Sequence, residues 1–267
     1  MELQLAAPDR RLAGIAGRYV DAAARPGAPE TTAELPGRSL VVIIDLDDGW
    51  TVDGRRYGSF VGGLYDRPVH VGHGGGYRCV QLDLEPTALR RLTGVPAGAL
   101  AAETVALEDL LGPEAHRLAE RLHDAPDARA RFAILDDLLL RRLASAPPPR
   151  RPDVERAWKL LRASRGRLRT DELAAAVGCS RRTLSARFAE EIGVGPKLAA
   201  RLVRLEHVRA RLGAAPLARI AAEQGFADQA HLSRELRALT GRTPTELLAE
   251  ARPTPFPEVQ DRSAGAA

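Results

Sequence analysis

Residues 170–188 read TDELAAAVGCSRRTLSARF, and residues 217–236 read LARIAAEQGFADQAHLSREL. Each stretch is typical of a short alanine-rich helix, a turn at a glycine, and a second helix that carries exposed polar side chains. One such match is weak, because many alanine-rich helical pairs look alike. Two matches whose turn glycines, Gly178 and Gly225, lie 47 residues apart are much stronger. The sequence therefore predicts two helix-turn-helix units, each with one helix that can enter a DNA major groove.

The segment between the two units is predicted to be one long helix. It begins at Pro196, a residue type favoured in the first turn of a helix, and ends at Gly213. Leucines recur along it at helical spacing and form an apolar stripe, made of Leu198, Leu202, Leu205 and Leu212. Helix N-caps are predicted at Asp153, Thr170 and Ser180, because the side-chain oxygens of these residue types accept backbone hydrogen bonds.

Charge is distributed unevenly along the 267 residues. Residues 1–147 hold 17 arginines against 21 acidic residues, a net charge of −4, whereas residues 148–267 hold 22 basic and 14 acidic residues, a net charge of +8. The basic excess coincides with the predicted helix-turn-helix units. This asymmetry favours a polyanion as the partner of the C-terminal half, although a solvated charged surface would give the same composition.

The N-terminal part is predicted to combine short strands with helices. Residues 40–46, LVVIIDL, form a β-branched run too short for a typical helix. Further strands are predicted at 60–64, 68–71 and 77–84, with glycine-rich turns between them and a turn at Gly72. Helices are predicted at 12–24, 87–92, 113–123 and 127–143. Strands of this kind favour a small β-sandwich or barrel accompanied by helices.

A proline-rich stretch divides the chain. Residues 146–152, APPPRRP, lack an apolar anchor and are typical of a semi-rigid linker. We therefore predict an α+β protein, in which residues 1–145 form a mixed β-barrel or sandwich-like domain with helices. Residues 153–252 form an all-α domain with two helix-turn-helix motifs joined by a long helix. Residues 253–267 are predicted to be a disordered tail.

The two cysteines, Cys79 and Cys179, cannot form a disulfide framework or a multi-cysteine zinc site. Cys179 follows a turn glycine and is expected to pack as a small apolar residue. No targeting segment and no long apolar run is found, so a cytoplasmic protein that does not engage a membrane is expected.

The C-terminal part of the sequence resembles the AraC/XylS family of transcription regulators. The resemblance is carried by RLEHVRARL at 204–212, IAAEQGFADQAHLSREL at 220–236 and TGRTP at 240–244, and it spans residues 153 to about 252. The segment from about Pro36 to Leu143 also resembles a sensor-type domain of unknown function found on some members. The resemblance implies two recognition helices that read successive major-groove segments on one face of DNA. A joining helix of about 16 residues is roughly 24 Å long, which suits the spacing of about 34 Å between successive turns once the widths of the recognition helices are added.

In the first recognition helix, Arg181, Arg182 and Ser185 face outward if Leu184 and Phe188 face the core. Arg182 is the leading candidate for base contact, because a guanidinium can bind guanine O6 and N7 together. Arg187 is expected to meet a phosphate. The predicted DNA-binding residues of this helix are Arg181, Arg182, Ser185 and Arg187.

In the second recognition helix, the exposed polar set is Gln229, His231, Ser233 and Arg234. The resemblance places His231 and Arg234 at groove-facing positions. Gln229 could pair with adenine or contact the backbone.

The N-terminal domain leaves several alternatives open. Gln81 and Asp83 could line an effector cavity, or form an outward-facing polar edge of a strand. His70 and His73, near Asp83, carry the residue types found at the metal sites of cupin barrels, so the alternative function is a metal-dependent cupin-type enzyme with an auxiliary helical domain. No catalytic motif is found, and no catalytic residue, metal or cofactor is expected.

The function predicted from the sequence is sequence-specific DNA binding in transcription regulation. The N-terminal domain would sense an effector or mediate dimerisation. The expected partners are double-stranded promoter or operator DNA, RNA polymerase, a small-molecule effector and a second copy of the chain. The sequence does not distinguish an activator from a repressor.

Overall fold

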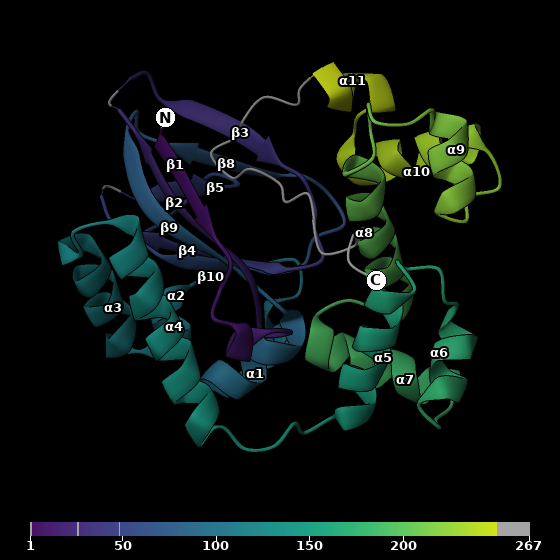
Figure 1. Cartoon of the computed structure of the whole chain (residues 1–267), viewed down its shortest axis with the longest axis horizontal. Helices are drawn as coiled ribbons and strands as arrows, with labels where there is room; N and C mark the ends of the chain where they lie inside the picture. The colour runs from purple at the N-terminus through teal and green to yellow at the C-terminus, as the bar shows by residue number, and fades with distance from the viewer. Residues whose placement is uncertain (1, 26, 48, 250–267) are drawn as a thin grey trace.

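The computed structural model describes residues 2–25, 27–47 and 49–249 (Figure 1). The tail predicted at residues 253–267 lies outside the described residues. Two antiparallel sheets with helices packed against them precede an all-helical part, as Figure 1 shows. The α+β class predicted from the sequence is therefore confirmed, and the two sheets form a sandwich within the described part of the chain.

The strands form two sheets. The first has six strands in the described residues, in the order β1 (Glu2–Ala6), β2 (Ala16–Ala24), β9 (Tyr77–Leu84), β4 (Leu40–Asp45), β7 (Phe60–Gly62) and β10 (Thr104–Ala106). The second has four, in the order β3 (Glu30–Glu34), β8 (Val69–His73), β5 (Trp50–Val52) and β6 (Arg55–Tyr57). Strand β9 covers the residues predicted for it, and it pairs with β2 on one side and with β4 on the other.

Strand β9 is buried on both faces. Val80 and Leu82 join the main apolar core, whereas Tyr77 and Cys79 join a second cluster with side chains from both sheets. Because successive side chains of a strand point to opposite faces, one strand supplies both clusters. The outward-facing polar edge considered for Gln81 is wrong, since that side chain is 2% exposed.

The helix predicted at residues 12–24 is wrong. Only Arg10–Leu12 forms a short 3-10 helix, η1, and Ala16–Ala24 forms strand β2. This strand pairs with β1 and β9 along its two edges and buries Tyr19 and Val20 completely. Tertiary pairing thus overrides the helical preference of its alanines.

The turn predicted at Gly72 is also wrong, because this glycine lies inside strand β8. A Cβ atom at this position would lie 2.8 Å from the Thr31 hydroxyl of strand β3. The absence of a side chain therefore permits a close approach between neighbouring strands.

Helices of the N-terminal part cover the first sheet. They are α1 (Pro86–Thr93), η2 (Ala97–Leu100), α2 (Leu107–Leu111), α3 (Pro113–Asp124) and α4 (Ala128–Ser145). Helix α4 contacts strand β2, where the Tyr19 hydroxyl donates to Asp136 Oδ1 at 2.9 Å and the Tyr19 ring stacks on Phe132. Helices were predicted at three of these places, and α1, α3 and α4 confirm them.

The C-terminal part is helical throughout the described residues. Its helices are α5 (Pro152–Ala163), α6 (Thr170–Ala176), α7 (Arg181–Ile192), α8 (Pro196–Arg209), α9 (Leu217–Glu223), α10 (Gln229–Thr240) and α11 (Pro244–Ala249). The predicted cap at Ser180 is confirmed, since its hydroxyl accepts from the Thr183 N–H at 3.0 Å. The caps predicted at Asp153 and Thr170 are wrong by one or two residues, because Arg151 and Arg169 occupy the N-cap positions.

One apolar core runs through both parts of the molecule. The same cluster contains Leu89 of α1, Trp158 of α5, Phe188 of α7 and Leu202 of α8. Segment η2 packs directly on α7, and a Cβ atom on Gly98 would lie 2.3 Å from the Glu190 carbonyl oxygen. The first helix-turn-helix unit is therefore packed against the N-terminal part of the chain.

Candidate nucleic-acid interface

The first helix-turn-helix unit consists of α6, a tight turn and α7. Gly178 has φ +74, a left-handed conformation that favours glycine. The Cys179 N–H then donates to the Ala174 carbonyl at 3.0 Å, and Ser180 caps α7. Leu173, Ala174, Leu184 and Phe188 are buried and hold the two helices together. Cys179 is half-buried against this core, which fits the apolar packing expected for it.

The second unit repeats this construction with α9 and α10. Gly225 also has φ +74, and the next N–H, of Phe226, donates to the Ala221 carbonyl at 2.9 Å. Asp228 caps α10, its carboxylate accepting from the His231 N–H at 2.6 Å. This cap was not among those predicted from the sequence, although an aspartate three residues before the donating N–H is a common N-cap signal. Two similar local geometries at the ends of one helix make a genuine structural repeat.

Helix α7 presents part of its predicted polar set to solvent. Arg181 and Arg182 are exposed, and Ser185 is half-buried. Arg187 instead donates to Asp153 Oδ2 of α5 at 2.7 Å. Burial acts to raise the pKa of Asp153, but the hydrogen bond and charge of Arg187, together with backbone hydrogen bonds, outweigh burial and hold the pKa below its usual value. One nitrogen of the Arg187 guanidinium is therefore engaged within the protein, and a phosphate contact would have to use its other donors.

Helix α10 exposes most of its predicted polar set. Gln229, His231 and Arg234 are exposed, while Ser233 is half-buried and its hydroxyl donates to the Gln229 carbonyl at 2.9 Å. The His231 ring lies edge-on to Phe226, with ring centroids 5.3 Å apart. These polar side chains surround the N-terminal half of the helix, the part that contacts base edges in helix-turn-helix proteins.

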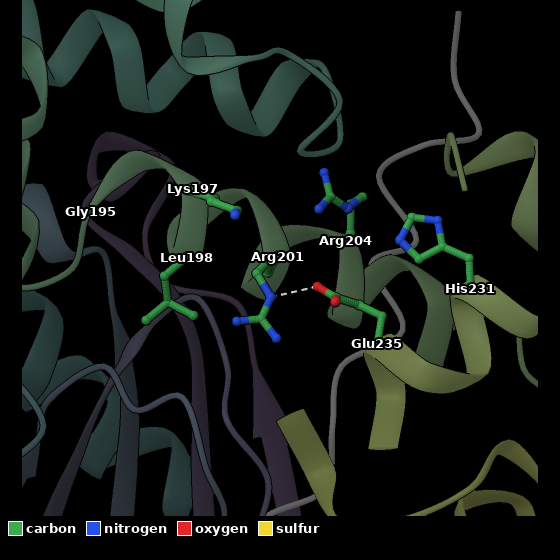
Figure 2. Close-up of a pocket in the computed structure, with 7 residues that line it drawn as sticks. All are labelled: Gly195, Lys197, Leu198, Arg201, Arg204, His231 and Glu235. Carbon is green, nitrogen blue, oxygen red and sulfur yellow. Dashed lines mark hydrogen bonds and ion pairs between the residues drawn. The ribbon is translucent and has the colours of Figure 1, made fainter. Parts of the chain in front are cut away.

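Between the two units lies a groove that the sequence analysis missed. Its volume is about 610 Å³, and Figure 2 shows the side chains that line it along α8 and α10. The lining residues are Gly195, Lys197, Leu198, Arg201, Arg204, His231 and Glu235. The sequence pattern that could have predicted this groove is a set of three cations, Lys197, Arg201 and Arg204, at positions i, i+4 and i+7 of the joining helix. That helix was interpreted only through its apolar stripe, of which Leu202 and Leu205 are buried and Leu198 and Leu212 half-buried.

The structure does not assemble the metal site considered for the N-terminal domain. His70 and His73 belong to β8 of the second sheet, whereas Asp83 belongs to β9 of the first sheet and pairs with Arg18 at 2.9 Å. His70 is exposed and lies 3.6 Å from Asp53. Among the described residues, no group of three or more histidine, cysteine or acidic side chains is arranged to hold a metal ion.

Gln81 and Asp83 do lie together. The Gln81 amide donates to Asp83 Oδ1 at 2.6 Å, and the Gln81 carbonyl oxygen has no hydrogen-bond partner in the structure. Both side chains are therefore placed inside the molecule as a connected polar pair.

None of the helices in the described part of the chain has the length and apolar character needed to cross a bilayer.

Comparisons with known proteins agree with the helix-turn-helix geometry. Residues 173–250 match a family described as a helix-turn-helix domain. A transcriptional regulator with an AraC-type DNA-binding domain from Chromobacterium violaceum is 30% identical, covering 39% of this chain and 96% of its own, with a TM-score of 0.36. No curated protein matches the chain.

Two further solved structures are similar over more of the chain. ToxT from Vibrio cholerae O395 is 10% identical, covering 86% of this chain and 97% of its own, with a TM-score of 0.49. The AraC-like transcriptional activator CuxR is 16% identical, covering 74% of this chain and 84% of its own, with a TM-score of 0.25.

Two helix-turn-helix units at the ends of one helix define a DNA-binding protein of the helix-turn-helix class. The chain belongs to the family of transcription regulators with an AraC-type DNA-binding domain, as the match of residues 173–250 and the 30% identical relative show.

Proposed function

We propose that this chain is a sequence-specific regulator of transcription whose helices α7 and α10 read two successive major-groove segments of a promoter. The observation that carries the proposal is the repeated unit at each end of α8. With 14 residues, α8 is about 21 Å long. Adding the widths of α7 and α10 brings their separation near the roughly 34 Å of one DNA turn.

Base selection is assigned to the exposed side chains of the two recognition helices. Arg182 would bind guanine, and Gln229 would pair with adenine or contact the backbone. Arg181, Ser185, Arg187, His231, Ser233 and Arg234 complete the proposed DNA-contacting set. Affinity would come largely from arginine contacts with phosphates, and sequence choice from contacts with base edges.

The N-terminal domain is proposed to control the DNA-binding domain, either by binding an effector or by dimerising. Gln81 and Asp83 are the proposed effector contacts, supported by the Gln81 carbonyl oxygen that lacks a partner inside the protein. An unsatisfied buried acceptor is costly, and a ligand donor would remove that cost. RNA polymerase and a second copy of the chain are further proposed partners.

Selection from a randomised duplex pool tests the proposed DNA reading. The full-length chain, at moderate ionic strength, is expected to enrich duplexes with two preferred segments about 10 base pairs apart, centre to centre. The double variant Arg182→Ala/Arg234→Ala should lose this enrichment while retaining its fold by circular dichroism. A full-length chain that prefers no duplex over bulk competitor would contradict the proposal.

Thermal shift measurements against a panel of metabolites, combined with the mass in solution, test the role of the N-terminal domain. A compound that raises the midpoint of unfolding for the original chain but not for Gln81→Leu supports effector binding. A dimeric mass with no stabilising compound supports assembly alone. A monomer stabilised by nothing in the panel would contradict both roles.

A further inference from the structure

We propose that the groove-facing side of α8 is a phosphate-binding site, at which Lys197, Arg201 and Arg204 hold the DNA backbone between the two major-groove segments. This inference rests on the DNA binding proposed above. It gives the joining helix a direct role in affinity, in addition to its role as a spacer.

The position of the groove supports this role. It begins at Gly195, between the end of α7 and the start of α8, and it ends at His231 in the first turn of α10. In Figure 2 the side chains of Lys197, Arg204 and His231 lie around the same open space. A duplex engaged by both recognition helices must pass its backbone along the segment that joins them.

The spacing of the three cations along α8 is comparable with the spacing of phosphates along one DNA strand. Residues at i, i+4 and i+7 share one face of a helix. Lys197 and Arg204 are seven residues apart, which corresponds to about 10 Å along the axis. Successive phosphates of one strand advance about 3.4 Å along a duplex. The face therefore spans about three phosphates when α8 runs along the DNA.

The three cations are held differently. Arg204 is fixed, because its Nη1 donates to the Gly166 carbonyl at 2.6 Å and its guanidinium lies 5.7 Å from the centre of the Phe226 ring. Arg201 pairs with Glu235 of α10 at 2.6 Å, the bond drawn in Figure 2. Lys197 is exposed and makes no ion pair within the described ranges. One carboxylate against three cations leaves the groove positively charged, which suits a polyanion.

Amine labelling offers a direct test, because Lys159 and Lys197 are the two lysines of the chain. Lys159 lies on α5, outside the groove, and its ammonium pairs with Glu155. The full-length chain is labelled with an amine-reactive reagent, with and without a mixed-sequence duplex of about 30 base pairs, or three helical turns. We expect saturating DNA to protect Lys197 and to leave Lys159 unchanged by mass spectrometry. Equal labelling of Lys197 in both samples would overturn the site.

Salt titration by fluorescence anisotropy gives a second readout. Lys197→Gln should lower the slope of log K against log salt by about one, and should weaken selected and mixed-sequence duplexes by the same factor. Lys159→Gln is the matched control and should change neither quantity. Glu235→Gln should tighten binding to both duplexes, since it removes the one carboxylate of the groove.

The outcomes separate this inference from the proposed function. If the original chain binds a selected duplex but Lys197→Gln keeps the original slope, the α8 site fails while DNA reading stands. If the original chain binds no duplex at all, the DNA-binding proposal and the α8 site fail together.

Discussion

Arg182 and Arg187 of α7 have different surroundings, although they are only five positions apart. Arg187 is held by Asp153 of α5, and this ion pair ties the first recognition helix to the rest of its domain. Arg182 is exposed and makes no ion pair among the residues that the structure describes. An arginine without an intramolecular partner can form both hydrogen bonds of a bidentate base contact without first giving up another interaction.

Replacing Arg182 by alanine should weaken binding to the selected duplex by about 1–3 kcal/mol and relax selectivity at one base pair. The loss follows from the two hydrogen bonds that a guanidinium can make to guanine. Fluorescence anisotropy on the selected duplex and its single-base variants measures both effects. Arg156→Ala, on the exposed side of α5, is the control and should leave binding unchanged. An equal loss on every sequence would instead assign Arg182 to a phosphate.

Glu34 should make the stability of the protein depend on pH. Burial raises the pKa of this half-buried carboxyl to about 7, although the nearby Arg209 acts in the opposite direction. The protonated form is therefore favoured in the folded state. Its stabilising contribution is complete below the ordinary pKa of 4.5 and is lost as the pH rises through about 7.

In Glu34→Gln, this loss of stability should disappear. The free energy of unfolding is measured in urea at pH 5 and pH 8. At pH 8 the variant should be more stable than the original chain by about 2 kcal/mol. This figure follows from about 1.4 kcal/mol per unit of pKa, reduced because the group is partly exposed. The two proteins should differ little at pH 5. A constant difference between them at both pH values would rule out titration of Glu34 as the cause.

At the scale of elements, the local sequence pattern was enough to predict the secondary structure of some segments, whereas in others the secondary structure depends on pairing with distant strands. Strand β9 was predicted with its observed limits, because apolar and polar residues alternate from Val80 to Leu84. Strand β2, AGRYVDAAA, was mistaken for a helix, since its strand state depends on pairing with β1 and β9. Strand β3, ETTAE, is polar and carries little apolar pattern, so it was missed.

The candidate site was predicted where it depends on local sequence. Turn glycines and core leucines define each helix-turn-helix unit, and they also imply which side chains of α7 and α10 point outward. The engagement of Arg187 with Asp153 could not be predicted, because 34 residues separate the partners. The basic groove likewise depends on how α10 packs beside α8, which the sequence of either helix alone does not specify.

The contact between η2 and α7 leaves no room for a side chain at Gly98. In Gly98→Ala, the new Cβ would meet the carbonyl oxygens of Ala189 and Glu190 at 2.6 and 2.3 Å, so one element must shift. We expect a loss of about 1–3 kcal/mol in the free energy of unfolding, as for other overpacked sites. Gly37→Ala is the control, since its Cβ would meet nothing within 4 Å and its φ is not positive. Equal stability of the two variants in urea would show that η2 and α7 separate freely.

At the scale of the whole molecule, a buried ionic cluster centred on Glu85 joins the N-terminal and C-terminal parts of the chain. Its carboxylate is 3% exposed and accepts from the Trp158 indole at 2.7 Å. It also pairs with Arg38 at 3.1 Å and with Arg162 at 2.8 Å. Arg38 in turn pairs with Glu206 of α8 at 2.5 Å. The N-terminal part of the chain is thus bonded to both α5 and α8.

Removing the central carboxylate should destabilise the protein strongly. In Glu85→Ala, Arg38 and Arg162 lose a buried partner, and we expect a loss of about 3–5 kcal/mol. Trp158→Phe keeps an aromatic ring in the core but loses one hydrogen bond to a charged group, so about 1.5–3 kcal/mol is expected. Urea unfolding followed by circular dichroism measures both. Because one apolar core runs through both parts of the chain, the original chain should unfold in a single transition. Two separate transitions would contradict this coupling.

The seating of η2 against α7 has a consequence for how a regulatory signal would spread. Segment η2 of the N-terminal part contacts α7 directly, whereas α9 and α10 are joined to α7 through α8. An effector that loosens the domain contact would first alter recognition of the promoter half beneath α7. If the chain regulates a promoter as proposed, operators mutated in one half or the other should respond unequally to the same signal.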